Sequence, residues 1–303
     1  MSLKTAVILP TYNGIAHAHL LIDALRAQTA TTDLLLVDSG STDGTLEAFK
    51  ASGLIHELVE ITTAQFNHGG TRQMMVDTFA DYEVYILLTQ DAYPADAYAF
   101  EQLIACFKDS QVGAACGRQL PHTDASPLAA HARYFNYPAT SSIKSKADIA
   151  QLGIKVPFVS NSFSAYRAQA LREVGGFPAD VILSEDMYVA AKMVMQGWKV
   201  AYCAEAQVHH SHNYSLKQEW QRYFDIGVFH AQQAWIRQEF GGAGGEGLRF
   251  VRSELDYLKD QKWRWPTALL RNAGKLLAYK IGQKETLLPV WLKKRLSMHR
   301  AFW

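Results

Sequence analysis

The sequence of 303 residues predicts an α/β protein with a mixed, mainly parallel sheet, flanking helices and a helical C-terminal region. Short apolar runs rich in branched side chains recur along the chain, as is typical of strands buried on both faces. Polar turns and then helical patterns follow the first two runs. Half of the residues are hydrophobic (49%), which is enough for one large domain.

The chain opens with two strand–turn–helix units. Residues 5–9 predict a buried strand, residues 10–14 a turn, and residues 18–27 a helix with a leucine-rich face. Residues 34–37 predict the second strand, which ends at Asp38 in a turn rich in Gly, Ser and Asp. Neither turn contains G-x-G-x-x-G or G-x-x-x-x-G-K-[ST], so a dinucleotide fold and a P-loop are disfavoured.

Asp38 lies where open parallel sheets bind ligands, at the carboxyl end of a strand. Its carboxylate can accept hydrogen bonds from a base N–H or from ribose hydroxyls. Alternatively, Asp38 and Asp43 only form the turn and cap the next helix, for which Ser41 or Thr42 is the expected N-cap.

After a third predicted strand (residues 55–61), Gly69-Gly70 and Arg72 begin a helix. Paired glycines let the backbone approach a ligand closely. A helix start together with a guanidinium favours an anion or a planar base. The alternative is a glycine loop with a surface arginine.

The clearest transition from a strand to a site is at residues 84–91. Residues 84–88 predict a central strand, and Asp91 lies just beyond its end. A carboxylate there can hold Mg²⁺ or Mn²⁺ against a diphosphate. A lone aspartate after a strand has a structural explanation too, but Asp38 at another strand end favours the metal.

The middle of the chain predicts further elements and a second acidic site. The expected elements are a helix at 96–107, strands at 112–116, 158–166 and 199–203, a helix at 167–174, and a loop-rich insertion on the acceptor side at 121–142. Glu185 and Asp186 open a helix that ends at Gly197. Acids in the first turn of a helix interact favourably with the helix dipole, which is one explanation for both residues. Alternatively, one of the two is a general base.

Three histidines precede Tyr214. If the segment is extended, alternation places His210 and His212 on one side. We expect a single histidine to join Asp91 on a cation, and a surface histidine cluster is the alternative.

The C-terminal part combines predicted helices (216–240 and 248–303) with a glycine-rich linker at 241–247. Residues 262–303 carry ten Lys and Arg and only Glu285 as acid, a net charge of +9, so the remainder carries −8. Four tryptophans lie in this tail: Trp263, Trp265, Trp291 and Trp303. We expect it to dock on an anionic membrane face. The alternative is packing on the preceding α/β part of the chain or on a second copy of it.

The three cysteines form neither a disulfide framework nor a zinc pattern, which fits a reducing compartment. The first residues do not look like a secretory leader, and no run of about 18 apolar residues occurs. We therefore expect a cytoplasmic protein, peripheral on the inner face of the cell membrane, with no nucleic-acid partner.

Taken together, the motifs resemble the family 2 inverting glycosyltransferases with the GT-A fold, over about residues 4–230. The matching pieces are Pro10-Thr11-Tyr12-Asn13, residues 37–45, Gln90-Asp91, Gly175-Gly176-Phe177, Glu185-Asp186 and the histidines before Tyr214. Phe66–Arg72 with Leu88–Ala92 is similar to the rhamnosyltransferase branch. The resemblance implies a Rossmann-like GT-A catalytic domain over 1–215 with a helical region over 216–303, dTDP-L-rhamnose as donor, and a lipid-linked O-antigen or other polysaccharide precursor as acceptor.

The resemblance also implies residue roles. Asp186 would be the catalytic base, with Glu185 beside it, and Asp91 would hold a divalent metal with His210 or, as second choice, His212. The base and ribose would be framed by Pro10, Tyr12, Asp38 and Arg72. Gln90 and Asp91 stand at the D-x-D motif, whose first acid is missing here, so metal binding would use fewer carboxylates.

Inverting transfer requires one base on the acceptor hydroxyl and positive charge at the leaving diphosphate. A glycosidase requires two carboxylates that flank the bond, which the adjacent Glu185 and Asp186 cannot do alone. The remaining alternatives are a UDP-sugar donor, a non-catalytic sugar-nucleotide-binding module, or a nucleotidyltransferase. The last would need a glycine-rich first loop with a base, and residues 10–14 have one glycine and no base.

Overall fold

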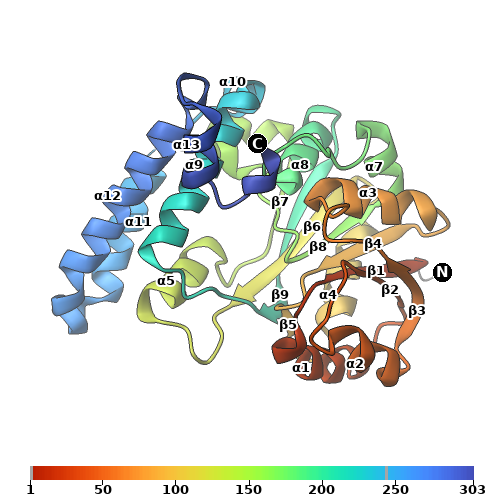
Figure 1. Cartoon of the computed structure of the whole chain (residues 1–303). Coiled ribbons are helices and arrows are strands. Elements are labelled where there is room, and N and C mark those ends of the chain that lie inside the picture. The colour runs from red at the N-terminus through yellow and green to blue at the C-terminus, as the bar shows by residue number, and fades with distance from the viewer. Residues whose placement is uncertain (1–2, 243–244) are drawn as a thin grey trace.

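The computed structural model describes residues 3–242 and 245–303, and a nine-stranded mixed sheet forms its centre (Figure 1). The spatial order is β3-β2-β1-β4-β8-β6-β9-β5, with β7 beside β9. The strands are β1 (Thr5–Thr11), β2 (Asp33–Asp38), β3 (Ile55–Glu60), β4 (Val84–Leu88), β5 (Tyr93–Pro94), β6 (Val112–Leu120), β7 (Ser142–Lys144), β8 (Phe163–Arg167) and β9 (Lys199–His209). β1 to β4, β6 and β9 run in one direction, and β5, β7 and β8 run in the other.

Two hydrophobic cores lie on the two faces of the sheet. Along β1, Ala6 and Ile8 enter one core and Val7 and Leu9 the other, as the two-residue period of a strand requires. One face is covered by α1 (Ile15–Arg26), α2 (Thr45–Ser52) and α4 (Ala99–Ala105), with the 3₁₀ turn η1 (Cys106–Lys108) after it. The other face is covered by α3 (His68–Thr78), α7 (Ala168–Val174) and α8 (Glu185–Met195).

The predicted α/β class and mainly parallel sheet are confirmed, and the differences from the expected elements have local causes. The segment expected as loop, 121–142, contains α5 (Pro127–Asn136), because Ser126 caps it by accepting from Ala129 N at 3.3 Å and proline occupies its first position. The N-cap expected for α2 is wrong: Gly44 occupies that position, with a φ of 94°. Ser41 instead donates to Asp38 Oδ2 at 2.6 Å.

The C-terminal helices pack against the part of the chain that contains the sheet and against one another. They are α9 (Leu216–Gln232), α10 (Ala234–Phe240), α11 (Glu246–Tyr257), α12 (Trp265–Gly282) and α13 (Val290–Leu296), joined by short 3₁₀ turns. The helix expected over 216–240 is broken at Gln233, where ψ is 50°. In the linker expected over 241–247, Ala243 and Gly244 lie outside the described residues. Among the helices of the described ranges, none is long and apolar enough to cross a bilayer.

Glycines allow α12 to lie close against α9. A Cβ on Gly282 would collide with the backbone carbonyl of Phe224, and a Cβ on Gly227 with that of Tyr279. Ala278 of α12 is fully buried in the core that also contains Phe224. α12 is therefore an integral part of the fold on this side.

Candidate active site

The candidate site lies at the edge of the sheet where β1, β2, β4, β6 and β9 end. Because these strands run in the same direction, the residues that follow them gather at one edge. β8 runs the opposite way and begins at this edge, where Phe163 pairs with Leu88 of β4.

Asp38 shapes the turn that follows β2. Its carboxylate accepts hydrogen bonds from Thr11 Oγ1 at 2.9 Å, Gly40 N at 3.0 Å, and Ser41 N and Oγ at 2.8 and 2.6 Å. The residue is 1% exposed. These contacts account for Asp38 as a turn residue, and a nucleoside contact by its carboxylate stays a prediction.

Gln90 ties the end of β4 to the end of β1. Its Oε1 accepts from Tyr12 N at 2.9 Å, and its Nε2 donates to Tyr12 O at 3.0 Å. Pro10 lies in β1, in register with Val37. The Tyr12 side chain is left 46% exposed at the edge of the sheet, where it is accessible to a ligand.

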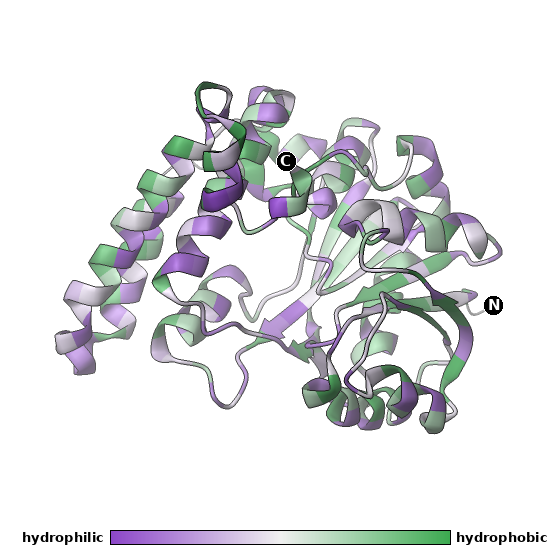
Figure 2. Cartoon of the chain, viewed as in Figure 1, coloured by the Kyte–Doolittle hydropathy of each residue, from purple (hydrophilic) through white to green (hydrophobic). Residues whose placement is uncertain are grey.

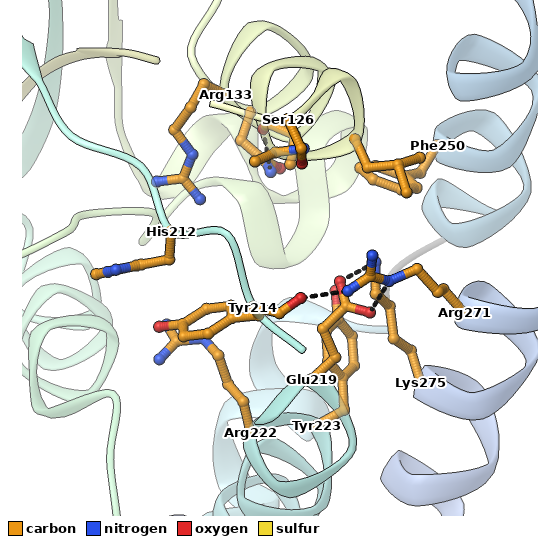
Figure 3. A pocket seen from close by; sticks show the side chains of 14 residues that line it. Ser126, Arg133, His212, Tyr214, Glu219, Arg222, Tyr223, Phe250, Arg271 and Lys275 are labelled. Atoms are coloured by element: carbon orange, nitrogen blue, oxygen red, sulfur yellow. Dashed lines mark hydrogen bonds and ion pairs between the residues drawn. The ribbon is translucent and has the colours of Figure 1, made fainter. Parts of the chain in front are cut away.

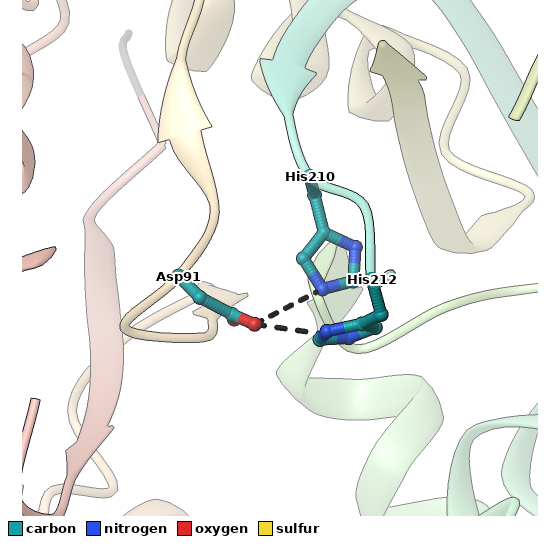
Figure 4. A group of neighbouring side chains, drawn as sticks. All are labelled: Asp91, His210 and His212. Carbon is teal, nitrogen blue, oxygen red and sulfur yellow. Dashed lines mark ion pairs between the residues drawn. The ribbon is translucent and has the colours of Figure 1, made fainter. Parts of the chain in front are cut away.

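Asp91, His210 and His212 come together as a group that could hold a metal ion (Figure 4). One ligand atom from each lies within 4.8 Å of the others. Asp91 Oδ2 is 3.5 Å from His210 Nε2 and 3.7 Å from His212 Nε2. The sequence favoured one histidine beside Asp91, and the structure brings both to it.

Neighbouring groups orient this cluster. His210 Nδ1 lies 2.9 Å from Gln119 Oε1, which can only accept, so Nδ1 carries a proton and Nε2 is the nitrogen that faces Asp91. Burial alone would raise the pKa of Asp91, but the hydrogen bond and charge of His210 outweigh it and hold that pKa well below its usual range. Burial, reinforced by His210, lowers the pKa of His212 to about 4, which leaves a neutral ligand at neutral pH.

Glu185 forms a buried ion pair with Arg72. Arg72 Nη1 lies 2.6 Å from Glu185 Oε1 and also donates to His68 O at 2.9 Å. Asn161 Nδ2 donates to the same Glu185 oxygen at 3.0 Å. Arg72 is 5% exposed, so the alternative of a surface arginine is wrong.

Asp186 has a different environment from its neighbour. Its Oδ2 accepts from Asn161 N at 3.1 Å, and its Oδ1 from Met187 N at 2.7 Å. Burial and the charge of Glu185 raise the pKa of Asp186 to about 6. For Glu185, burial is outweighed by Arg72 and the net pKa is lowered. Two adjacent carboxylates thus differ in proton affinity, a pattern typical of acid–base sites.

Residues 160–162 connect the two parts of the site. Ser160 Oγ accepts from Gln119 Nε2 at 3.0 Å, and Ser162 O accepts from Thr89 N at 3.3 Å. Asn161 contacts both Glu185 and Asp186. The sequence did not identify Asn161 or Gln119, because both lie in segments expected to be strands or their extensions.

Comparisons with known proteins agree with this architecture. Residues 4–224 match the family described as glycosyltransferase like family 2. The chain is 50% identical over 304 residues to the O-antigen chain rhamnosyltransferase RfbN of Salmonella typhimurium, covering 99% of this chain and 96% of that protein. It is 48% identical over 300 residues to the O-antigen chain rhamnosyltransferase WbaN of Salmonella anatum, covering 98% and 95%.

Solved structures share the fold at lower identity. The mannosyltransferase PcManGT from Pyrobaculum calidifontis, in complex with GDP-Man and Mn²⁺, has a TM-score of 0.59 and 19% identity, covering 100% of this chain and 85% of that one. S. aureus TarS 1-349 in complex with UDP-GlcNAc has a TM-score of 0.54 and 14% identity, covering 94% and 92%. The expected GT-A fold is confirmed, and the chain belongs to glycosyltransferase family 2 and is a glycosyltransferase.

Proposed function

We propose that this enzyme transfers L-rhamnose, with inversion, from dTDP-L-rhamnose to a hydroxyl of a lipid-linked O-antigen or related polysaccharide precursor. The observation that carries the proposal is the identity of 50% and 48%, over almost the whole chain, to two proteins named O-antigen chain rhamnosyltransferases. The sugar and the acceptor rest on those names, and the inverting chemistry rests on the site.

Asp186 is the proposed base. A base must be unprotonated at working pH and still have appreciable proton affinity, and a pKa of about 6 meets both conditions. Glu185 is less suited, because its buried ion pair with Arg72 lowers its pKa and so weakens its affinity for the acceptor proton. Its proposed role is to fix Arg72 and to raise the pKa of Asp186 by its charge.

The Asp91 cluster is proposed to hold the metal. The residues fit one: a partly buried carboxylate and two imidazole nitrogens converge, and Gln119 fixes the tautomer of His210. Two imidazoles favour Mn²⁺ over Mg²⁺, which prefers oxygen ligands. When bound, the ion would supply positive charge to the departing diphosphate.

The proposed nucleotide contacts are Pro10, Tyr12, Asp38, Gln90 and Arg72. Tyr12 has the exposed ring, and Gln90 fixes its backbone. Asp38 and Arg72 are almost fully buried and would act mainly by shaping the turns beside the base and ribose. Arg72 carries a second buried nitrogen, Nε, without a partner within the described chain.

The donor assignment is tested with purified enzyme, a lipid-linked acceptor fraction, and dTDP-rhamnose, UDP-glucose, UDP-GlcNAc and GDP-mannose as donors. We expect acceptor-dependent release of dTDP from dTDP-rhamnose and thermal stabilisation by dTDP. Stabilisation by UDP-sugars alone would contradict the donor. Nucleotide binding without any release, with every donor, would identify a non-catalytic binding module.

The tail is proposed to rest on an anionic membrane. Hydrophobic and hydrophilic residues alternate along α12 (Figure 2). Several of its apolar side chains are largely exposed: Leu269 (47%), Leu270 (64%), Leu276 (60%) and Leu277 (54%). Of the four tryptophans, Trp263 and Trp291 are 72% and 66% exposed, and the other two are half-buried. Each Lys or Arg side chain near an anionic leaflet contributes about 1 kcal/mol to the free energy of membrane binding, before screening by salt.

Removing the tail would disrupt the packing of α12 on α9, so point substitutions are the better test. We expect Leu270→Ser/Leu277→Ser to reduce sedimentation with anionic liposomes at low salt. The control is Leu248→Ser, an equally exposed leucine (56%) on α11, outside the basic tail. Equal partitioning of both variants and the parent would contradict the membrane proposal.

A further inference from the structure

A basic pocket of about 120 Å³ opens beside His212, between α5, the loop that follows β9, and helices α9, α11 and α12 (Figure 3). Four permanently basic side chains line it: Arg133, Arg222, Arg271 and Lys275. Glu219 is the one acid among its described lining residues. These four bases and one acid give the pocket wall a net charge of about +3 at neutral pH.

Glu219 is shared by two of the cations. Its oxygens lie 2.8 Å from Arg271 Nε and 3.2 Å from Lys275 Nζ. All three side chains are largely buried, with exposed fractions of 18% for Arg271, 13% for Lys275 and 16% for Glu219. Charges removed from water are stabilised by pairing, and one carboxylate cannot neutralise two cations. The excess positive charge of the pocket wall therefore favours binding of an anion.

Arg222 adds an unneutralised cation at the side nearest the cluster of Asp91 and the histidines. None of the ion pairs among the described residues includes Arg222, whose side chain lines the pocket together with Tyr214 (Figure 3). Tyr214 stacks on His212 with ring centroids 4.8 Å apart and planes at 26°. A guanidinium in this position matches the oxygens of a phosphate.

His212 belongs to both the pocket and the metal cluster, since its Nε2 is 3.7 Å from Asp91 Oδ2. The opposite wall is aromatic: Lys275 Nζ lies 5.7 Å from the Tyr223 ring centroid and 5.4 Å from that of Phe250. Aromatic rings can pack against a sugar and a neighbouring basic side chain can bind its phosphate, so this wall suits a sugar that carries a phosphate.

We infer that this pocket is an anion subsite that binds a phosphoryl group of the acceptor while the donor diphosphate occupies the Asp91 side of His212. The inference rests on the proposed glycosyl transfer for the identity of the two substrates. It assigns α5, within residues 121–142, and α12 to binding of the acceptor phosphate, whereas the sheet-edge residues would act on the acceptor hydroxyl and the donor.

Binding of inorganic pyrophosphate tests the subsite directly. The titration uses the full chain in metal-free buffer, with and without saturating dTDP, and follows thermal stabilisation or heat. We expect saturable binding that persists with dTDP present, and a loss of about tenfold or more in affinity for Arg222→Gln and for Lys275→Gln. Lys217→Gln, an exposed base on α9 outside the pocket, is the matched control and should bind like the parent.

Competition between pyrophosphate and dTDP would overturn the inference, because the pocket would then belong to the donor site. Equal pyrophosphate binding by Arg222→Gln, Lys275→Gln and the control would overturn it too. If the chain binds no dTDP, the proposed donor fails, but the pyrophosphate titration without nucleotide still decides the subsite.

Transfer assays identify the source of the phosphate. The donor is dTDP-rhamnose, and the acceptors are a glycosyl diphosphate lipid and the matching neutral alkyl glycoside. We expect Arg222→Gln to lower kcat/KM about tenfold or more for the phosphorylated acceptor and little for the neutral one. An equal loss with both acceptors would overturn the assignment of the pocket to an acceptor phosphate.

Discussion

Replacing Asp186 by asparagine is the sharpest test of the proposed base. Asparagine keeps the size of the side chain and one carbonyl oxygen, but its NH₂ group replaces an oxygen that accepts from Asn161 N or Met187 N. The resulting donor–donor contact costs about 1–3 kcal/mol of folding stability, which leaves a folded protein in the usual range of stabilities. Turnover should fall much further, by about 10²–10⁴-fold, which is about 2.7–5.4 kcal/mol in the barrier.

The pH dependence separates a lost base from a disturbed fold. Because the pKa of Asp186 is raised to about 6, the carboxylate is protonated as the pH falls through 6. We expect kcat/KM of the parent enzyme to fall about tenfold per pH unit below that value, and Asp186→Asn to lack this break. Glu185→Gln should move the break to lower pH, because it removes the neighbouring negative charge that helps to raise the pKa.

The assay is initial-rate release of nucleoside diphosphate between pH 5 and 8, with dTDP binding measured in parallel. The matched control is Asp81→Asn, an exposed aspartate before β4, which should behave like the parent. Turnover of Asp186→Asn within about threefold of the parent would refute the base assignment. A break that persists near pH 6 in this variant would show that another group titrates there.

Three further outcomes follow from the same contacts. Asp91→Asn should abolish Mn²⁺-dependent stabilisation and transfer while the chain stays folded; activity in this variant with metal chelated would contradict the metal site. Arg72→Met should cost about 3–5 kcal/mol of unfolding free energy, because it leaves Glu185 charged and buried, and adding Glu185→Leu should recover part of this; urea unfolding of both variants measures it. Gly282→Ala should lose about 1–3 kcal/mol by pushing α12 away from α9, whereas Gly274→Ala on the same helix, with open space around it, should be neutral or stabilising; equal stabilities would argue against the close approach.

The strand ends were predictable because a local change in the sequence marks each of them. At Asp38 and Asp91 a buried apolar run stops and polar residues begin, and this change depends on a few neighbouring residues only. The pairing of Arg72 with Glu185 could not be predicted in this way, since 113 positions separate the two residues. Only the packing of α3 against the start of α8 brings them together.

The C-terminal region was predictable in composition and less so in its contacts. Its basic charge and its tryptophans are visible in the sequence, but which side faces solvent depends on where α12 crosses α9. Gly227 and Gly282 mark that crossing, and an isolated glycine in a helical pattern is equally consistent with a surface position. The basic pocket was missed for the same reason, because its lining comes from separate helices.

Asn161 illustrates how the mixed sheet itself produces the site. In an all-parallel sheet the residues beside Asp91 would all follow strand ends, and a search for polar residues after apolar runs would find them. Here β8 runs antiparallel between β4 and β6, so the residues that precede a strand lie at the ligand edge. Asn161 lies there, with its backbone N–H on Asp186 and its side chain on Glu185. The reversed strand thus brings the proposed base to the edge where Asp91 lies, and sequence patterns that follow strand ends alone cannot reveal it.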